Sequence, residues 1–261
     1  MALADEFDGL LIDLDGVVWI GRELVPGSDE ALRSLLEAGK EIVFVTNNPG
    51  KSAAEYARRL REAGVDVGAE RIVTAGEATA SLAAERIPGG TAFAIGAPAF
   101  HETIAAAGLK LLEREAAREA EIVLVSGHRG FDYEELLTAT QALQGGAVLF
   151  ATSRDPTMPM PGGPVPGTGA VLAAVETASG AAAEIGGKPE PALFEEARKR
   201  IAAAKRVAMV GDRVSSDIEG GRRAGLETIL VLSGATSREE AERANPQADH
   251  VVDDLAALAR P

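Results

Sequence analysis

The chain alternates short apolar runs with polar or glycine-rich turns and with segments of helical periodicity. This alternation is typical of an α/β protein, in which helices connect the parallel strands of a sheet. One helix is predicted to begin at Ser28 and to end before Gly39. A second follows the capping box of Ser52–Glu55 and ends at Gly64. The expected strands are Leu10–Leu14, Ile42–Thr46, Ala92–Gly96, Ile122–Ser126, Ala147–Ala151, Val207–Val210 and Thr228–Leu232.

The pattern also divides the chain. Strand-loop-helix units are clearest in residues 1–75 and 180–261, whereas the segment 76–179 has strands and helices of its own and is long enough to bury a separate core. Within it, the uncharged stretch Pro156–Val175 contains five prolines and four glycines, which indicate a loop that leads into a helix. The sequence therefore predicts a second α/β domain inserted into the first, and no membrane span.

Charge limits the partners that the protein can bind. The 261 residues include 40 acidic and 26 basic side chains, which give a net charge of −14. This charge opposes binding to nucleic acid or to an anionic membrane unless basic residues cluster. The pairs Arg58–Arg59 and Arg222–Arg223 lie on helix-like stretches among acidic residues, so we interpret them as solvated faces. We expect neither nucleic acid nor a membrane as a partner.

Composition narrows the class of protein further. Apolar residues make up 46% of the chain and charged residues 25%, as in ordinary soluble globular proteins. The absence of cysteine excludes disulfides, thiolate metal sites and a cysteine nucleophile. The first nine residues, MALADEFDG, carry three acidic side chains where a secretory signal would be basic. We therefore expect a cytoplasmic protein.

Candidate chemistry lies directly after the expected strands, because parallel sheets bind ligands at the carboxyl ends of their strands. Asp13-Leu14-Asp15-Gly16 follows the first strand. An aspartate fixed at a strand end can act as a nucleophile, and Asp15 lies on the same side of an extended chain as Asp13. Gly16 allows a sharp turn and the close approach of an anion. By itself, such a pair of aspartates is more often a turn or a helix cap.

Two further aspartates, Asp212 and Asp217, follow the expected strand Val207–Val210. Three carboxylates at one sheet edge repel each other unless a cation lies among them, and hard oxygen ligands favour Mg²⁺. The alternative is that Asp212 merely ends the strand and that Asp217 caps a helix over Ile218–Ala224. The residues by themselves leave both interpretations open.

Two other loops supply a hydroxyl and an ammonium group. Thr46-Asn47-Asn48 ends the second strand, and Lys188 precedes a late helix. Threonine is ordinary in a strand, and most lysines are solvated. However, a hydroxyl, backbone N–H groups and an ammonium at the ends of separate β units are the set that holds three phosphoryl oxygens. The combination predicts a phosphate site.

Four motifs, in their order along the chain, resemble those of the haloacid dehalogenase (HAD) superfamily of phosphohydrolases: Asp13-x-Asp15-Gly16, Thr46-Asn47-Asn48, Gly187-Lys188-Pro189 and Gly211-Asp212-x4-Asp217. The long gap between Thr46 and Lys188 is similar to that of class IIA, or NagD-like, members, which carry a large C2-type cap there. The stretches DLDGVVW, TNNPGKSAAEY and GKPEPALF resemble that group closely. The resemblance implies a Rossmann-like catalytic core at 1–75 plus 180–261 and a substrate-specificity cap at 76–179.

The resemblance also implies a role for each matching residue. Asp13 would be the nucleophile and a metal ligand, and Asp15 would be the general acid and base, with its carbonyl oxygen on the metal. Asp212 would bind the metal directly, and Asp217 would do so through water or by holding another ligand. The implied phosphate-binding residues are Gly16, Thr46, Asn47 and Lys188.

On this resemblance we expect a Mg²⁺-dependent phosphatase that hydrolyses monoesters of small metabolites through an aspartyl-phosphate. Sugar, polyol or hydroxy-acid phosphates are the expected substrates, with p-nitrophenyl phosphate as an artificial one, and a homodimer through the cap is implied. One alternative is a phosphotransferase to an acceptor alcohol. Another is an inactive metabolite-binding regulator, against which the retention of Asp13, Asp15, Lys188 and Asp212 argues.

The cap matches the subclass only in outline. Relatives often read ATNPD where residues 151–155 of this chain read ATSRD, so Arg154 is a departure. Polar residues on a surface are common without a function. The candidates for substrate contact are His128, Arg129, Asp132 and Asp155. The alternative is that these four are surface residues without a function.

Three further side chains outside the four motifs need an interpretation. Trp19 is the only tryptophan and follows the nucleophile loop, so it either forms a wall of the site or packs in the core. His101 and His250 lie on apolar segments with no partner in view in the sequence. We interpret both histidines as structural.

Overall fold

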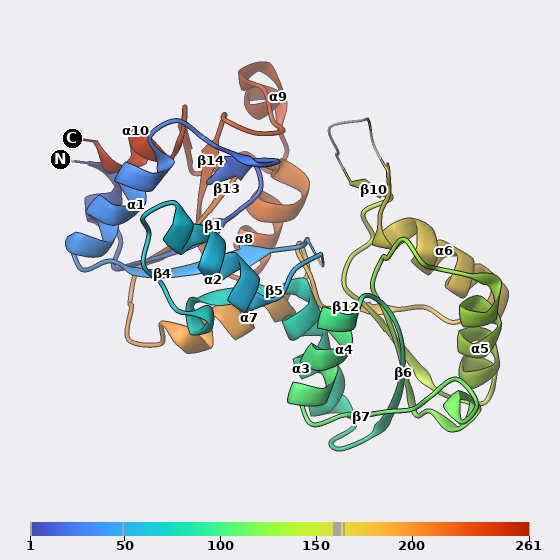
Figure 1. The fold of residues 1–261 in the computed structure, drawn as a ribbon. Helices are drawn as coiled ribbons and strands as arrows, with labels where there is room; N and C mark the ends of the chain where they lie inside the picture. Colours follow the sequence, from blue (N-terminus) through green and yellow to red (C-terminus); the bar gives the residue numbers. More distant parts are fainter. Residues whose placement is uncertain (1, 49, 159–162, 164, 261) are drawn as a thin grey trace. The chain divides into compact units, whose positions relative to one another are not determined.

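A computed structural model of the chain describes residues 2–48, 50–158, 163 and 165–260. The fold class is α/β, as predicted (Figure 1). The chain divides into two compact units. Unit 1 comprises Met1–Thr46, Ala53–Val73 and Lys188–Pro261, and unit 2 comprises Asn47–Ser52 and Thr74–Gly187.

Unit 1 is built on a six-stranded sheet with the order β15-β14-β13-β1-β4-β5, in which the pairs from β15 to β4 are parallel. Strand β1 lies between β13 and β4. A short hairpin, β2 (Trp19–Ile20) and β3 (Glu23–Leu24), follows β1. The strands of the sheet are β1 (Gly9–Asp13), β4 (Glu41–Thr46), β5 (Ile72–Thr74), β13 (Val207–Gly211), β14 (Glu227–Val231) and β15 (His250–Val252).

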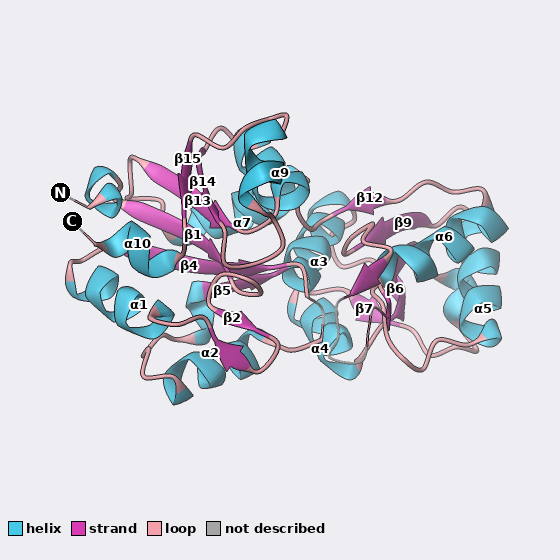
Figure 2. Ribbon diagram, turned by 90° about the horizontal axis from the view of Figure 1, so that it is seen from above, coloured by secondary structure: helices cyan, strands magenta, loops and turns pink. Residues whose placement is uncertain are grey.

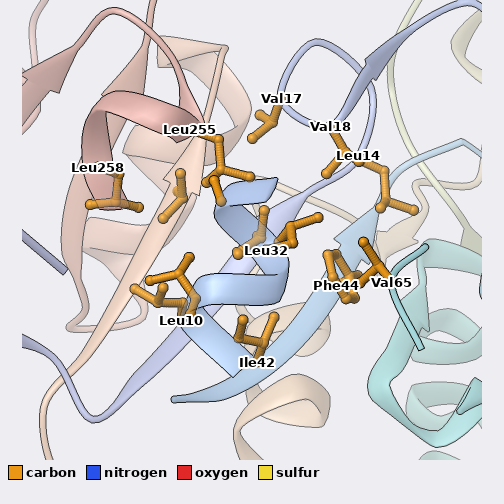
Figure 3. Close-up of a cluster of buried hydrophobic side chains, with 14 of the residues drawn as sticks. Leu10, Leu14, Val17, Val18, Leu32, Ile42, Phe44, Val65, Leu255 and Leu258 are labelled. Carbon is orange, nitrogen blue, oxygen red and sulfur yellow. The ribbon is translucent and has the colours of Figure 1, made fainter. Parts of the chain in front are cut away.

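Helices pack on both faces of this sheet, because alternate residues of each strand point to opposite sides. On one face, Leu10 and Ile42 join an apolar cluster with Leu32 and Leu255 (Figure 3). On the other face, Met209 lies against α8. The helical segments of unit 1 are η1 (Leu3–Glu6), α1 (Ser28–Glu37), α2 (Ala53–Glu62), η2 (Ala69–Arg71), α7 (Pro191–Arg200), η4 (Val214–Ile218), α8 (Glu219–Arg223), α9 (Arg238–Arg243) and α10 (Leu255–Ala259).

Unit 2 has a parallel sheet of its own, with the order β12-β9-β8-β6-β7. Helices α5 and α6 cover one face of this sheet, and α3 and α4 cover the other (Figure 2). Val123 packs in one cluster with Leu172 of α6, and Leu124 packs in another with Ile104 of α4. The elements of unit 2 are α3 (Ala75–Arg86), β6 (Thr91–Ile95), α4 (Pro98–Ala106), β7 (Lys110–Leu111), η3 (Ala117–Glu119), β8 (Ile122–Val125), α5 (Tyr133–Gln144), β9 (Val148–Ala151), β10 (Thr157–Met158), β11 (Val165–Pro166), α6 (Thr168–Ser179) and β12 (Glu184–Ile185).

The seven expected strands are all present, each with ends within one residue of those expected. The division between the units lies at Gly187–Lys188, whereas the core segment was expected to resume at residue 180. The reason is that β12 pairs with β9 and so extends the sheet of unit 2. Within the stretch Pro156–Val175, helix α6 begins at Thr168, while residues 159–162 and 164 lie outside the described residues.

Candidate active site

Three neighbouring strands of unit 1 bring distant residues together at their carboxyl ends. Asp13 is the last residue of β1, and Thr46 is the last residue of β4. Asp212 directly follows β13. Because β1 pairs in parallel with both neighbours, these three residues share one edge of the sheet.

Lys188 makes a buried ion pair with two carboxylates at this edge. Its Nζ lies 2.6 Å from Asp13 Oδ1 and 2.6 Å from Asp217 Oδ1, and only 3% of its side chain is exposed. Burial alone would lower the pKa of Lys188, but the carboxylates of Asp13 and Asp217 outweigh burial and raise that pKa above its ordinary value. Lys188 is therefore a fixed cation, and the alternative of a solvated lysine is wrong.

Asp13, Asp212 and Asp217 form a compact cluster in which one oxygen of each carboxylate lies within 4.8 Å of the others. Burial raises the pKa of Asp13 well above its ordinary value, and the neighbouring carboxylates add to this rise against the opposing effect of Lys188. Burial and Asp217 also raise the pKa of Asp212 to about 6. One lysine thus faces three buried acids, which leaves negative charge to be balanced.

The cluster fits a hard divalent cation. Its ligand atoms are carboxylate oxygens, which such cations prefer. Asp212 Oδ1 is buried and has no hydrogen-bond partner among the described residues. Among the residues that the structure describes, Asp13, Asp212 and Asp217 are the one group of three or more potential metal-ligating side chains. An additional positive charge would relieve the repulsion and give Asp212 Oδ1 a partner.

Asp217 does not cap a helix. It lies inside the π-helical segment η4, and α8 begins only at Glu219. Its Oδ2 accepts the backbone N–H of Arg213 at 3.0 Å, while its Oδ1 faces Lys188. The helix-cap alternative is therefore wrong, and Asp217 connects the lysine to the loop after β13.

Asp15 is held by Trp19. The indole Nε1–H donates to Asp15 Oδ1 at 3.1 Å, and the backbone N–H of Gly16 donates to the carbonyl of Trp19 at 2.7 Å. Trp19 is completely buried within the core cluster of unit 1. Trp19 therefore packs in the core, as one of its two sequence interpretations predicts, and it also contacts a candidate catalytic residue.

Two residues of α2 extend this contact. The ring of Tyr56 lies nearly parallel to that of Trp19, with centroids 6.2 Å apart, and the guanidinium of Arg59 lies 3.8 Å from the Trp19 ring centroid. Arg59 also donates to the carbonyl of Gly21 at 2.7 Å. The interpretation of the Arg58–Arg59 pair as a solvated face is thus wrong for Arg59.

Gly16 is required by close packing. Its φ is +91°, and a Cβ at this position would lie 2.2 Å from Asp212 Oδ2. The N–H of Gly16 donates a hydrogen bond to the carbonyl of Trp19. In this structure, Gly16 therefore shapes the loop around Asp212.

The predicted phosphate-binding residues belong to two units. Thr46 is buried in unit 1 and shares a side-chain hydrogen bond with Tyr56, whose pKa burial raises above its ordinary value. Asn47 belongs to unit 2, where its Nδ2 lies 3.4 Å from Asp155 Oδ2. Asp155 is itself exposed.

The other candidates in unit 2 mostly contact neighbouring glutamates or the local backbone. His128 Nε2 lies 3.1 Å from Glu135 Oε2. Asp132 is the N-cap of α5, where its side chain accepts the N–H of Glu135. Arg154 pairs with Glu176 through two hydrogen bonds of 2.9 Å. Arg129 is exposed.

The two remaining histidines are not members of the cluster. His250 on β15 packs edge-on against Phe7, with centroids 6.2 Å apart, and its Nε2 is 3.7 Å from Glu227. His101 Nε2 on α4 is buried and lacks a hydrogen-bond partner within the described ranges. Both positions agree with a structural interpretation.

Sequence reasoning missed Tyr56, Arg59 and the segment Ser233–Thr236, which contacts Asp212 and Gly16. Ser233 follows the expected strand Thr228–Leu232, so the search for polar residues after strands could have found it. No comparable signal in the sequence marks Tyr56 or Arg59, because their partner is 37 or more positions away.

Comparison with known proteins identifies relatives for almost the whole chain. Residues 10–110 match a family model described as haloacid dehalogenase-like hydrolase, and residues 185–258 match a second one described as HAD-hydrolase-like. A curated D-glycerol 3-phosphate phosphatase of Mycobacterium tuberculosis is 38% identical over 247 residues, which are 94% of this chain and 68% of that protein.

Solved structures agree with these matches. A glycerol phosphate phosphatase from Mycobacterium tuberculosis in complex with magnesium superposes with a TM-score of 0.91 and 36% identity, covering 99% of this chain and 78% of that one. A p-nitrophenyl phosphatase from Archaeoglobus fulgidus gives a TM-score of 0.89 and 32% identity, with 97% and 98% covered. None of the helices in the described part of this chain is long and apolar enough to cross a membrane.

Proposed function

Because the chain belongs to the haloacid dehalogenase-like hydrolase family, we propose that it is a Mg²⁺-dependent phosphatase of small phosphate monoesters. The observation that carries the proposal is the buried group of Asp13, Asp212, Asp217 and Lys188 at the sheet edge, with Asp15 two residues beyond Asp13. A carboxylate nucleophile, a second carboxylate and a cation-binding cluster are the parts that phosphoryl transfer through an aspartyl-phosphate requires.

In the first step, Asp13 attacks phosphorus while the bond to the leaving oxygen breaks. Lys188 anchors Asp13 through Oδ1, so the nucleophile is held in one orientation. Asp15 donates a proton to the leaving oxygen, with its carboxyl group fixed by the Trp19 indole. In the second step, Asp15 takes a proton from water as that water attacks the aspartyl-phosphate, which frees phosphate and restores Asp13.

The carboxylates of Asp13 and Asp212, with the carbonyl of Asp15, would hold the metal, and Asp217 would act through water or by holding another ligand. When bound, Mg²⁺ neutralises charge on the carboxylates and on the phosphoryl oxygens. The phosphate oxygens would be bound by the Thr46 hydroxyl, the Lys188 ammonium and the loop at Asn47.

For the substrate, we propose a polyol, sugar or hydroxy-acid phosphate. The support is the similarity to a D-glycerol 3-phosphate phosphatase and to a p-nitrophenyl phosphatase. In unit 2, we propose Arg129 and Asp155 as contacts to the leaving group, because both are exposed. His128 would then hold its loop through Glu135.

The test is phosphate release from a panel of phosphorylated metabolites and p-nitrophenyl phosphate, with Mg²⁺ or with EDTA. We expect Mg²⁺-dependent release from at least one polyol or sugar phosphate and from the aryl phosphate. Adding an acceptor alcohol should leave the yield of free phosphate unchanged, since a phosphotransferase would divert it. No release from any substrate by folded protein would refute the proposal.

A further inference from the structure

The loop that follows β14 makes three separate contacts with the catalytic edge of unit 1. We call the segment Ser233–Thr236 the β14 loop. It contains none of the carboxylates of the site, and it lies about 20 positions after Asp212 in the sequence. Its contacts therefore form only when β13 and β14 pair.

Two hydrogen bonds hold Asp212, one at its side-chain carboxylate and one at its backbone carbonyl. The backbone N–H of Ala235 donates to Asp212 Oδ2 at 2.7 Å. The hydroxyl of Thr236 donates to the backbone carbonyl of Asp212 at 2.6 Å. Thr236 is itself buried, so solvent does not compete for this bond.

Packing restricts the same carboxylate further. A Cβ on Gly234 would lie 2.1 Å from Asp212 Oδ2, and a Cβ on Gly16 would lie 2.2 Å from it. The Asp212 carboxylate is thus enclosed between two glycine backbones. The hydroxyl of Ser233 donates to the carbonyl of Gly16 at 2.7 Å, which ties these two loops together.

The result is an asymmetric carboxylate. Oδ2 has a hydrogen-bond donor and lies against two glycine backbones, whereas Oδ1 is buried without a partner among the described residues. A buried carboxylate oxygen without a donor is costly unless a ligand completes it. The arrangement leaves one oxygen of Asp212 for a cation.

We propose that the β14 loop is the positioning element of the metal site and that Thr236 is its key positioning residue. The β14 loop holds Asp212 so that only its Oδ1 faces the cation. Through the hydrogen bond from Ser233 to Gly16, it also holds the nucleophile loop beside the same carboxylate. This inference rests on the proposed metal-dependent function but adds residues outside the motifs. Groups that orient metal ligands commonly affect metal affinity by about 10- to 100-fold.

The test is Mg²⁺ binding to the full chain by isothermal titration calorimetry, without substrate. Thr236→Val removes the hydroxyl and keeps the shape, and we expect the Kd for Mg²⁺ to rise by about 10- to 100-fold. Thr236→Ser retains a hydroxyl and should restore most of the affinity. Ser237→Ala is the matched control: it removes the N-cap of α9 one residue further on, which does not contact Asp212, so its Kd should equal that of the wild type.

Circular dichroism of the metal-free proteins checks the fold, and Thr236→Ala replaces the valine variant if the latter does not fold. Equal affinities of folded Thr236→Val and wild type would overturn the inference while leaving the proposed function intact. An equal loss in Ser237→Ala would also overturn it, because general loosening of the loop would then explain the effect. Absence of Mg²⁺ binding to the wild type would overturn both proposals together.

Discussion

Units 1 and 2 share one architecture, a parallel sheet between helices, but they use their polar side chains differently. In unit 1, three buried carboxylates face one buried lysine. In unit 2, charged side chains pair with each other near the surface, as Arg154 does with Glu176 through two hydrogen bonds. The described residues of unit 2 contain no cluster of three metal-ligating side chains.

The difference shows that the sheet alone does not carry the chemistry, which resides in the loops at particular strand ends. The arrangement in unit 1 is unfavourable by itself, because burial and mutual repulsion raise the pKa values of Asp13 and Asp212. The pairs in unit 2 are complete without a ligand. We therefore expect changes in unit 1 to alter turnover and changes in the unit 2 pairs to alter stability.

The largest effect is expected at the nucleophile. Asp13→Asn should reduce the rate by roughly 10⁴-fold or more, because an amide is a poor nucleophile and an uncharged ligand. Glu176→Gln in unit 2 is the matched carboxylate-to-amide control and should keep turnover. Phosphate-release assays on proteins with equal circular dichroism compare the two. Similar losses in both variants would remove the contrast between the units.

The next effect concerns metal and pH. The pKa of Asp212 is raised from 3.8 to about 6 by burial first and by Asp217 second. In the metal-free protein, the stability linked to this group is present below its unfolded pKa and is lost as pH rises through about 6. Mg²⁺ needs the deprotonated carboxylate, so its stabilising effect should grow over the same range.

Melting curves at about pH 5 and about pH 7.5, with and without Mg²⁺, measure this linkage. At 100 times its Kd, Mg²⁺ should stabilise the protein by about 2.7 kcal/mol, or roughly 5–10 °C, at the higher pH and by less at the lower. Asp212→Asn should remove most of the difference. An equal shift at both pH values would show that Asp212 does not govern metal binding.

A smaller effect is expected when Asp15 loses its support. Trp19→Phe keeps a ring against Tyr56 and Arg59 but removes the N–H that donates to Asp15. A hydrogen bond worth about 1.4 kcal/mol corresponds to about 10-fold in rate. The loss should be larger for an alkyl phosphate than for p-nitrophenyl phosphate, whose phenolate leaves with little protonation.

Single-turnover measurements on both substrates give the comparison without interference from the hydrolysis step. If the two substrates lose rate equally, Trp19 supports the fold of the loop and not the acid function of Asp15. Because Trp19 is the only tryptophan in the chain, the variant has no tryptophan fluorescence, and its fold is checked by circular dichroism.

The sequence was sufficient to predict the main strands and the motif residues at their ends. Asp13, Thr46 and Asp212 could be placed together because each stands beside a strong apolar run, and parallel strands bring such ends to one edge. The same reasoning does not reach the contact of Trp19 with Tyr56 and Arg59. That contact depends on where α2 packs, which hydrophobic periodicity does not define.

Short elements were missed for a related reason. β12 has two residues, Glu184–Ile185, and carries no period that distinguishes a strand from a loop. Its pairing with β9 assigns residues up to Gly187 to unit 2. The partners of His128 and Arg154 were equally hidden, because a list of polar residues does not show which of them face each other.

The smallest effect should come from breaking the unit 2 pair. Arg154→Met keeps much of the side-chain length but removes the hydrogen bonds to Glu176, and it should cost about 1 kcal/mol or less, since the pair is partly exposed. The bonds from Arg154 hold the pKa of Glu176 below its ordinary value. The contribution of this pair to the free energy of unfolding should therefore be complete at neutral pH and disappear as pH falls through that lowered pKa.

Urea denaturation of the wild type and of Arg154→Met at neutral and acidic pH measures this contribution, with kcat and KM for the best substrate as the control. A loss of turnover well beyond the change in stability would mean that Arg154 serves the substrate and not the fold of unit 2.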